Sequence, residues 1–311
     1  MRAVVIRAFG GPEVLEMADV PVPAVGARQV RIRVEAATVN PVDLATRSGA
    51  LAAAGMLPER DQIGIGWDVA GVVEETGPEV TGIVPGQRVV GLSDRLDVPL
   101  GTQADQVVLD ADAVARAPEG VSPERAATLP LNGLTAVQAL DRLGLPDGGT
   151  LLVTGAAGAV GGFAVQLAAA RGHRVVAVAG AEDEALVRAL GAELFVPRTA
   201  RLGEAVRALV PGGVDGAIDA AVTGAAALDA VRTGGSFAAL VAGGAPPALR
   251  NIRVFSHWIY ADGARLADLV ALAEAGALTL RVAETLPLDQ VAAAHRRLAK
   301  GGLRGRIVLL P

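Results

Sequence analysis

Short apolar runs rich in β-branched residues fill the first 120 residues of the chain. They lie at 3–6, 29–39, 69–77 and 87–92, and Gly and Pro separate them. Runs of this kind are typical of strands, and strands at this spacing indicate a small barrel or sandwich. The first third of the chain is therefore predicted to be rich in β-structure.

From about Ser122 the hydrophobic pattern alternates between helical and strand-like segments. A helix at 123–144 is followed by a buried strand at 150–155, a helix at 159–172 and a strand at 174–180. The alternation continues through segments 182–191, 193–197, 203–210, 214–220, 224–235 and 236–244. Strands that alternate with helices of this length predict an α/β fold with a doubly wound parallel sheet.

The last part of the chain, from Asp262, returns to a different pattern. Two helices are expected at 264–278 and 288–302, and a final strand at 305–310. The chain has 311 residues, which is long enough for two hydrophobic cores. We expect two domains.

Composition and charge exclude several kinds of partner. The 28 basic and 33 acidic residues leave a net charge of −5, so the chain has no global basic field for nucleic acid or an anionic membrane. The apolar run in the opening segment is too short for a signal peptide. No run approaches the roughly 20 apolar residues of a membrane span. A cytoplasmic location and a small-molecule substrate are expected.

The chain has no cysteine and only three histidines, so the usual ligands of a protein-bound zinc ion are scarce. His173 and His295 are expected at the surface. His257 is the one histidine considered near a substrate, although a hydrogen-bonded structural role is the alternative. No metal site is predicted.

The strongest local signal is the turn after the predicted strand 150–155. Ala156, Gly158 and Gly161 occupy the G-x-G-x-x-G positions, and a helix follows at once. Such a turn lets the backbone approach a pyrophosphate at the N-terminus of a helix. We predict a dinucleotide site that includes Ala157, Gly158, Ala159, Val160 and Gly161.

Five blocks of the chain resemble the medium-chain dehydrogenase/reductase superfamily. They are more closely similar to its zinc-free branch of quinone oxidoreductases and enoyl reductases. The blocks keep the family's order and lie at 30–49, 65–92, 129–140, 151–172 and 301–310. The resemblance covers essentially the whole chain.

The resemblance implies a domain organisation and an activity. A GroES-like catalytic domain is expected at 1–120 and 259–311, and a Rossmann dinucleotide-binding domain at 121–258. The implied reaction is zinc-independent, NADPH-dependent hydride transfer to a quinone or an α,β-unsaturated carbonyl, with NADH also possible. The alternatives are an enoyl-thioester reductase of a biosynthetic pathway and a cofactor-binding structural or regulatory dimer without significant turnover.

The resemblance also assigns candidate catalytic residues. Zinc-dependent relatives have a Cys within the segment aligned with 40–43 and a His where this chain has Trp67. Asn40 is expected beside the nicotinamide, where its amide can donate a hydrogen bond to a ribose or substrate oxygen. The position of a suspected proton-donating Tyr is Ala45 here, so protonation is left to solvent, Thr46 or another residue. Asn132 is a further candidate donor, with a helix-end polar role as the alternative.

The remaining predicted cofactor contacts lie after other strands. Gly180 ends the second strand of the parallel sheet without an acidic residue that would read a ribose 2′-hydroxyl, and Glu182 is expected only to complement a helix dipole. Arg198 is expected to bind the 2′-phosphate of NADPH. Thr135, Leu240 and Val241 complete the predicted site. The apolar segment 253–259 predicts a homodimer seam.

Overall fold

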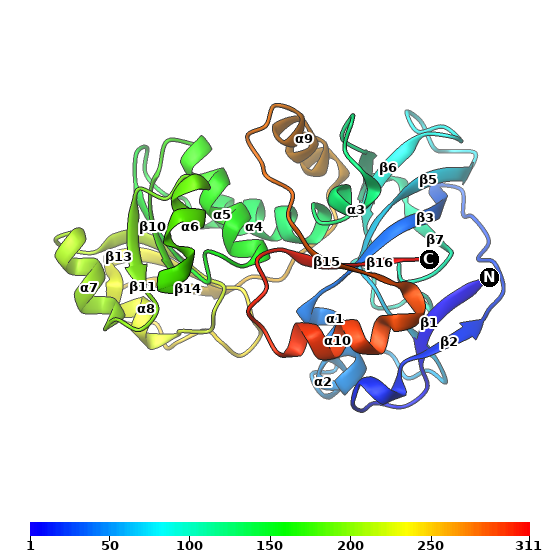
Figure 1. Ribbon diagram of the computed structural model, residues 1–311, viewed down its shortest axis with the longest axis horizontal. Helices are drawn as coiled ribbons and strands as arrows, with labels where there is room; N and C mark the ends of the chain where they lie inside the picture. Colours follow the sequence, from blue (N-terminus) through cyan, green and yellow to red (C-terminus); the bar gives the residue numbers. More distant parts are fainter. The chain divides into compact units, whose positions relative to one another are not determined.

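The computed structural model describes all 311 residues and divides into two compact units (Figure 1). The first contains Met1–Leu131, Ala261–Glu274 and Leu280–Pro311. The second contains Asn132–Tyr260 and Ala275–Thr279. The β-rich unit is thus built from both ends of the chain, and the first divide falls after residue 131, later than the predicted boundary after residue 120.

The first unit is built on two sheets. Its seven-stranded sheet has the order β15-β16-β3-β5-β6-β8, with β7 also paired to β3, and its small sheet has the order β2-β1-β4. The strands are β1 (Arg2–Ile6), β2 (Glu16–Asp19), β3 (Gln29–Val39), β4 (Ile63–Gly64), β5 (Asp68–Thr76), β6 (Arg88–Leu92), β7 (Gln106–Asp110), β8 (Val114–Arg116), β15 (Val282–Pro287) and β16 (Arg306–Leu310). The helical segments are η1 (Pro12–Val14), α1 (Pro41–Ser48), α2 (Ala50–Ala53), η2 (Ala111–Ala113), α3 (Pro123–Ala126), α9 (Gly263–Glu274), η4 (Leu288–Gln290) and α10 (Val291–Ala299).

Strand β3 organises this unit because its two halves have different burial patterns. Its first half alternates buried and less buried residues, so Val30, Ile32 and Val34 point into one core with Val69 and Val107. Its last residues are all buried, and its end packs with β16 in a second core. The fully buried end of β3 leads directly into α1, which positions the polar residues described below.

The second unit is built on one parallel sheet with the strand order β11-β10-β9-β12-β13-β14. The strands are β9 (Thr150–Thr154), β10 (Arg174–Ala179), β11 (Leu194–Pro197), β12 (Val214–Asp219), β13 (Val231–Ala239) and β14 (Arg253–Ser256). The helical segments are α4 (Pro130–Leu143), which begins in the first unit, α5 (Ala159–Ala170), η3 (Ala181–Asp183), α6 (Glu184–Ala189), α7 (Leu202–Leu209) and α8 (Ala225–Ala230). The predicted α/β class with a doubly wound parallel sheet is confirmed.

The order of strands reverses between β9 and β12. From β9 the chain runs outward through β10 to β11, and it then returns to the other side of β9 as β12. In an open parallel sheet, ligands bind beyond the carboxyl ends of the strands at such a switch point. The turn after β9 lies at this place in the fold.

Two predicted helices differ from the structure. The helix expected at 123–144 is interrupted, and α4 starts anew at Pro130, which has no N–H to donate to an earlier carbonyl. The helix expected at 224–235 ends at Ala230, because Val231 pairs with Val214 and opens β13. Strand pairing in the sheet therefore overrides the local helical pattern in the second case.

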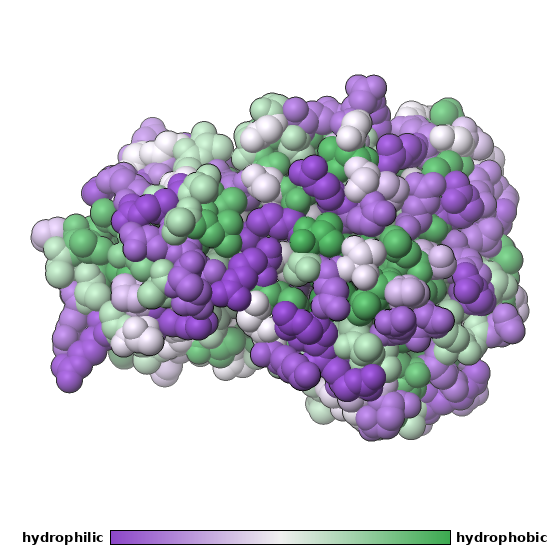
Figure 2. Space-filling model, viewed as in Figure 1, coloured by the Kyte–Doolittle hydropathy of each residue, from purple (hydrophilic) through white to green (hydrophobic).

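The surface mixes apolar and polar side chains. On the face drawn in Figure 2, apolar residues form small groups between polar ones. None of the helices combines the length and the apolar character that a bilayer crossing requires.

Candidate functional site

A buried polar cluster joins three segments of the first unit around the carboxylate of Asp68. Thr38 Oγ1 donates to Asp68 Oδ2, and Asn40 Nδ2 donates to the same oxygen at 2.6 Å. The backbone N–H of Leu131 donates to Asp68 Oδ1 at 2.6 Å. Thr38, Asn40 and Asp68 are fully buried. The end of β3, the start of β5 and the start of α4 are therefore tied to one carboxylate.

This cluster fixes the orientation of the Asn40 amide. Its Nδ2 also donates to Thr38 Oγ1 at 2.9 Å, so both amide hydrogens are used inside the cluster. The opposite amide orientation would face Oδ1 toward a carboxylate that can only accept. Asn40 Oδ1 is buried and has no hydrogen-bond partner. Both hydrogens of the Asn40 amide are therefore committed inside the cluster, and its expected role beside the nicotinamide stays a prediction.

Asp43 forms a second buried carboxyl next to the first. It lies in the first turn of α1, behind Pro41, and its Oδ2 accepts the backbone N–H of Asn40 at 2.7 Å. Burial raises its pKa to about 8, against the opposing effects of backbone hydrogen bonds and of Arg306. Burial also raises the pKa of Asp68. Asp43 therefore holds a proton at neutral pH.

The one basic group that bears on both carboxyls is Arg306, at the start of β16. Burial lowers its pKa to about 10, and the charges of Asp68 and Asp43 oppose that change. A buried cation beside two buried acids compensates part of the cost of removing them from water. The C-terminal strand thereby contributes to a cluster made otherwise from the N-terminal third of the chain.

A cavity of about 30 Å³ lies beside this cluster, entirely within the first unit. Thr46, Trp67, Ser93 and the charged Arg95 line it together with glycines and with apolar residues that include Leu57 and Ile65. The Thr46 hydroxyl donates to Val42 O at 2.9 Å, so its lone pairs are what it presents to the cavity. Ser93, whose N–H donates to Trp67 O at 2.7 Å, brings another hydroxyl to the wall. Sequence reasoning missed Ser93, because nothing local marks it.

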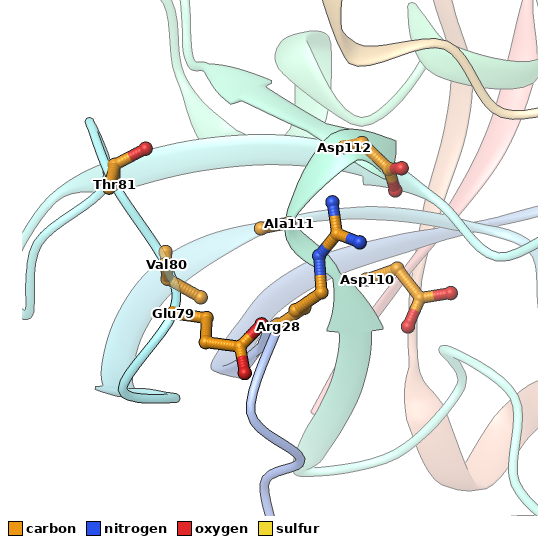
Figure 3. A pocket seen from close by; sticks show the side chains of 7 residues that line it. All are labelled: Arg28, Glu79, Val80, Thr81, Asp110, Ala111 and Asp112. Atoms are coloured by element: carbon orange, nitrogen blue, oxygen red, sulfur yellow. The ribbon is translucent and has the colours of Figure 1, made fainter.

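Another hollow on the same unit, of about 490 Å³, differs in chemistry. It is lined by Arg28, Glu79, Val80, Thr81, Asp110, Ala111 and Asp112. Figure 3 shows the Arg28 side chain extending between the acidic side chains from the surrounding segments. It includes no predicted site residue, and its walls are mostly charged. We therefore place the candidate substrate site in the cavity beside Thr46 and Trp67.

In the second unit the turn between β9 and α5 has the form that a dinucleotide requires. Gly155 has φ +62°, so it makes the tight turn one residue before Ala156, which stands at the first glycine position of the motif. Gly161 packs against this turn, because a Cβ there would lie 2.2 Å from Gly155 O. Gly158 is the N-cap of α5 and has ordinary dihedral angles. The predicted residues 157–161 thus form one continuous turn and helix start.

The carboxylate of Asp219 holds the loop after β12 beside this turn. It accepts the Thr154 hydroxyl at 2.5 Å, the N–H and hydroxyl of Thr223 at 3.1 Å, and the N–H of Gly224 at 2.8 Å. Thr154 Oγ1 in turn accepts the N–H of Ala221 at 3.2 Å. These bonds cross the switch point between β9 and β12. In the sequence, only the position of Asp219 at the end of an apolar strand segment indicates this role.

At the ends of β10 and β11 the structure brings together two side chains that bear on cofactor choice, those of Glu182 and Arg198. The Glu182 carboxylate folds back over Gly180, within 2.5 Å of where a Cβ of residue 180 would stand. Arg198 pairs with Glu182 at 3.4 Å and is 65% exposed in its side chain. The Arg198 N–H donates to Ala179 O at 2.7 Å. Glu182 therefore lies over the strand end, which was expected to be free of acidic groups.

The remaining predicted site residues lie at other places in the second unit. Leu240 and Val241 follow β13, and the Leu240 N–H donates to Asp219 O at 3.2 Å. Val241 is 42% exposed. Asn132 and Thr135 lie buried in the first turns of α4. Their predicted roles in catalysis and cofactor binding stay predictions.

Two histidines depart from expectation. His295 was expected at the surface and is fully buried on the inner side of α10, where burial and Arg47 lower its pKa to about 3. His257 follows β14 and is buried with neither ring nitrogen hydrogen-bonded. Burial lowers its pKa to about 4. It is therefore not the hydrogen-bonded structural histidine considered as the alternative.

Comparison with known families decides the classification. Residues 26–119 match the alcohol dehydrogenase GroES-like domain, and residues 190–309 match the family described as zinc-binding dehydrogenase. The chain belongs to the medium-chain dehydrogenase/reductase superfamily, in its quinone oxidoreductase-like branch. The predicted family and the GroES-like and Rossmann-type parts of this superfamily fold are confirmed.

Relatives within this superfamily are oxidoreductases. The chain is 31% identical to 2-methylene-furan-3-one reductase of Solanum lycopersicum, over 97% of this chain and 77% of that protein. It is 32% identical to a quinone oxidoreductase of Pseudomonas aeruginosa, over 98% of each. It is also 32% identical to the NADPH-dependent alkenal/one oxidoreductase of Arabidopsis thaliana, over 100% of this chain and 80% of that protein. A solved structure of an NAD-dependent alcohol dehydrogenase is 34% identical, with a TM-score of 0.89 and full coverage of both chains.

The zinc ion named in one family description does not fit the side chains of this member. Trp67 stands where the zinc-dependent relatives have a His ligand. Asn40 begins the segment in which they have a Cys, and both of its amide hydrogens are bonded inside the buried cluster. No group of three or more His, Cys, Asp or Glu side chains could hold a metal ion. We derive no step through zinc.

The buried acid Asp43 predicts an unusual dependence of stability on pH. Because its pKa is about 8 in the folded protein and about 4 in an unfolded chain, the folded state binds a proton that the unfolded state has released. This contribution is complete below about pH 4 and is lost as the pH rises toward 8. The free energy of unfolding should therefore fall over this range, by up to about 1.4 kcal/mol for each pH unit.

Urea denaturation at a series of pH values measures this slope. Asp43→Asn should flatten it, because the amide cannot titrate. Asp105→Asn is a matched control: hydrogen bonds from Arg2 help to lower the pKa of that carboxyl, so its titration lies below the range and the slope should not change. An equal slope in native protein and in Asp43→Asn would show that Asp43 is ionised in the folded state.

Proposed function

We propose that the protein is an NADPH-dependent oxidoreductase that transfers hydride to a quinone or an α,β-unsaturated carbonyl without zinc. The observation that carries this proposal is the cavity beside Asn40 and Asp68, whose wall has Trp67 where zinc-dependent relatives have a ligand. The wall of this cavity offers hydroxyls, apolar surface and the Arg95 side chain, which is paired with Asp97 and Asp110. An acceptor that already delocalises negative charge suits it, because a plain carbonyl relies on zinc for polarisation.

The second unit fits a nicotinamide dinucleotide. Gly155 makes the turn, and Gly161 lets α5 start close to it, so that the free N–H groups at the start of α5 can face a pyrophosphate. A side chain at Gly158 would stand on the outside of this turn, where its only close contact is Gly155 O at 3.1 Å. The space beside Gly158 is thus available to a ligand.

When bound, the nicotinamide supplies a hydride that adds to the β-carbon of the conjugated acceptor. The π electrons then move to the carbonyl oxygen, and a proton from solvent completes the saturated ketone. Ser93 is placed to donate a hydrogen bond to that oxygen from the cavity wall. Thr46, with its hydrogen on Val42 O, is placed to accept one.

Loss of NADPH absorbance in the presence of pent-1-en-3-one or menadione tests this proposal. We expect turnover with at least one of them after prolonged treatment with a chelator. Gly158→Val should abolish it while the protein stays folded, because the branched side chain takes the space of the pyrophosphate. The control Gly158→Ala adds only one methyl group and should retain part of the activity. Cofactor binding without turnover of any acceptor would favour a structural or regulatory role.

The choice between NADPH and NADH depends on Arg198 and Glu182. We propose that Arg198 binds the 2′-phosphate and that Glu182 turns away when it does. NADH is the second candidate, because Glu182 covers Gly180 at the strand end where a carboxylate can accept from a ribose 2′-hydroxyl. The two residues form one exposed ion pair, which contributes little by itself.

Dissociation constants of both cofactors decide between these candidates. Arg198→Ala should weaken NADPH by about 1.5 kcal/mol, the low end for charged hydrogen bonds because the group is exposed, and should leave NADH nearly unchanged. Glu182→Gln should tighten NADPH by removing a like charge. Tighter NADH binding by the native protein, lost in Glu182→Gln, would assign the ribose to Glu182 instead.

We also propose a homodimer joined through β14. This strand pairs only with β13, so it leaves one edge unpaired, and Trp258 just beyond it is 40% exposed. Trp258→Glu should weaken the dimer, as measured by light scattering at micromolar concentration. Leu209→Glu is the control, since that 43% exposed residue lies on α7, which packs near β11 at the other edge of the sheet. A monomeric native protein would refute the proposal.

A further inference from the structure

The candidate substrate cavity has a small volume compared with the sites that bind small organic ligands. Its volume of about 30 Å³ is room for roughly two water molecules, whereas sites for small organic ligands are commonly about 300 Å³ or larger. Apolar side chains make most of its wall, and the largest of these is Trp67. Trp67 is only 4% exposed. The indole therefore occupies space that a substrate would otherwise take.

The backbone on the N-terminal side of Trp67 is held in place. Gly66 has φ +113°, and a Cβ there would lie 2.5 Å from the backbone N of Gln103. Gly64 and Gly101 approach each other in the same way, since a Cβ on Gly64 would lie 2.5 Å from Gly101 N. The Gln103 N–H donates to Ile65 O at 3.0 Å. The two backbones are thus in direct contact and leave no space for a shift.

The backbone on the C-terminal side is held as firmly. Asp68 is the next residue, and its carboxylate accepts from Asn40 and from the N–H of Leu131. The carbonyl of Trp67 itself accepts from Ser93 at 2.7 Å. Because both neighbours and the residue's own carbonyl are fixed, the indole can leave the cavity only by a change of rotamer among buried groups.

We infer that Trp67 determines the substrate specificity of this cavity and restricts it to short, unbranched α,β-unsaturated carbonyls. This inference rests on the proposed function. A flat chain of a few carbon atoms requires the cavity to widen less than a fused-ring quinone does, and its carbonyl oxygen would accept a hydrogen bond from the Ser93 hydroxyl. A fused-ring quinone needs the space that Trp67 fills. Trp67 acts by exclusion and takes no part in the chemistry.

Values of kcat/KM for pent-1-en-3-one and menadione test the inference. The native protein should prefer the enone, and Trp67→Ala should raise kcat/KM for menadione about tenfold or more, in the range expected when a pocket gains space for substrate groups. Trp67→Phe should lie between the two. Phe9→Ala is the control: it removes another aromatic side chain of the same unit, outside the cavity, and should leave the ratio of the two substrates unchanged.

A binding measurement covers the case in which Trp67→Ala does not fold. The chain has two tryptophans, so Trp67 is the only one left in Trp258→Phe. Its fluorescence should change saturably with pent-1-en-3-one and without saturation with menadione. Equal use of both acceptors by the native protein, or an unchanged ratio in folded Trp67→Ala, would overturn the inference and leave the proposed function standing. Failure to reduce any acceptor would instead remove the proposed function.

Discussion

The arrangement of the buried polar cluster in the first unit depends on the carboxyl group of Asp68. It accepts hydrogen bonds from three segments that are distant in sequence, through Thr38, Asn40 and the backbone of Leu131. A buried carboxylate is costly unless donors surround it, and removing any one donor leaves part of that cost uncompensated. The same bonds that stabilise the charge also set the direction of the Asn40 amide and the position of Trp67. Stability and site geometry therefore have one physical origin here.

Two buried acids, Asp43 and Asp68, share one buried cation, Arg306, in this region. Burial and the charge of Asp68 raise the pKa of Asp43, and burial raises the pKa of Asp68. Arg306 favours their ionised forms while its own pKa is lowered by burial. The buried cation thus offsets part of the cost of removing the two acids from water.

The candidate site of the second unit depends first on the direction of its strands. Because all six strands are parallel, the turns that follow β9, β10, β12 and β13 emerge at one edge. Asp219 then fixes two of those turns against each other across the switch point, through Thr154 on one side and the loop to Gly224 on the other. A nucleotide-binding edge of this kind needs few special residues: glycines where the backbone is crowded and one acid that orders the loop.

The sequence by itself determined the fold class, because hydrophobic periodicity and Gly-Pro punctuation are local properties. It also located the turn at 155–161 and the positions 40 and 67, since these follow from spacing and resemblance. Tertiary structure alone decided which glycine makes the turn, that Glu182 lies over Gly180, that both hydrogens of the Asn40 amide are bonded inside the buried cluster, and that His295 is buried. Each of these depends on partners brought together by folding, such as Asp68 for Asn40 and Arg47 for His295. Neighbours in space determine the direction of a hydrogen bond and the burial of a side chain. Local sequence patterns do not identify these neighbours, because they are often distant along the chain.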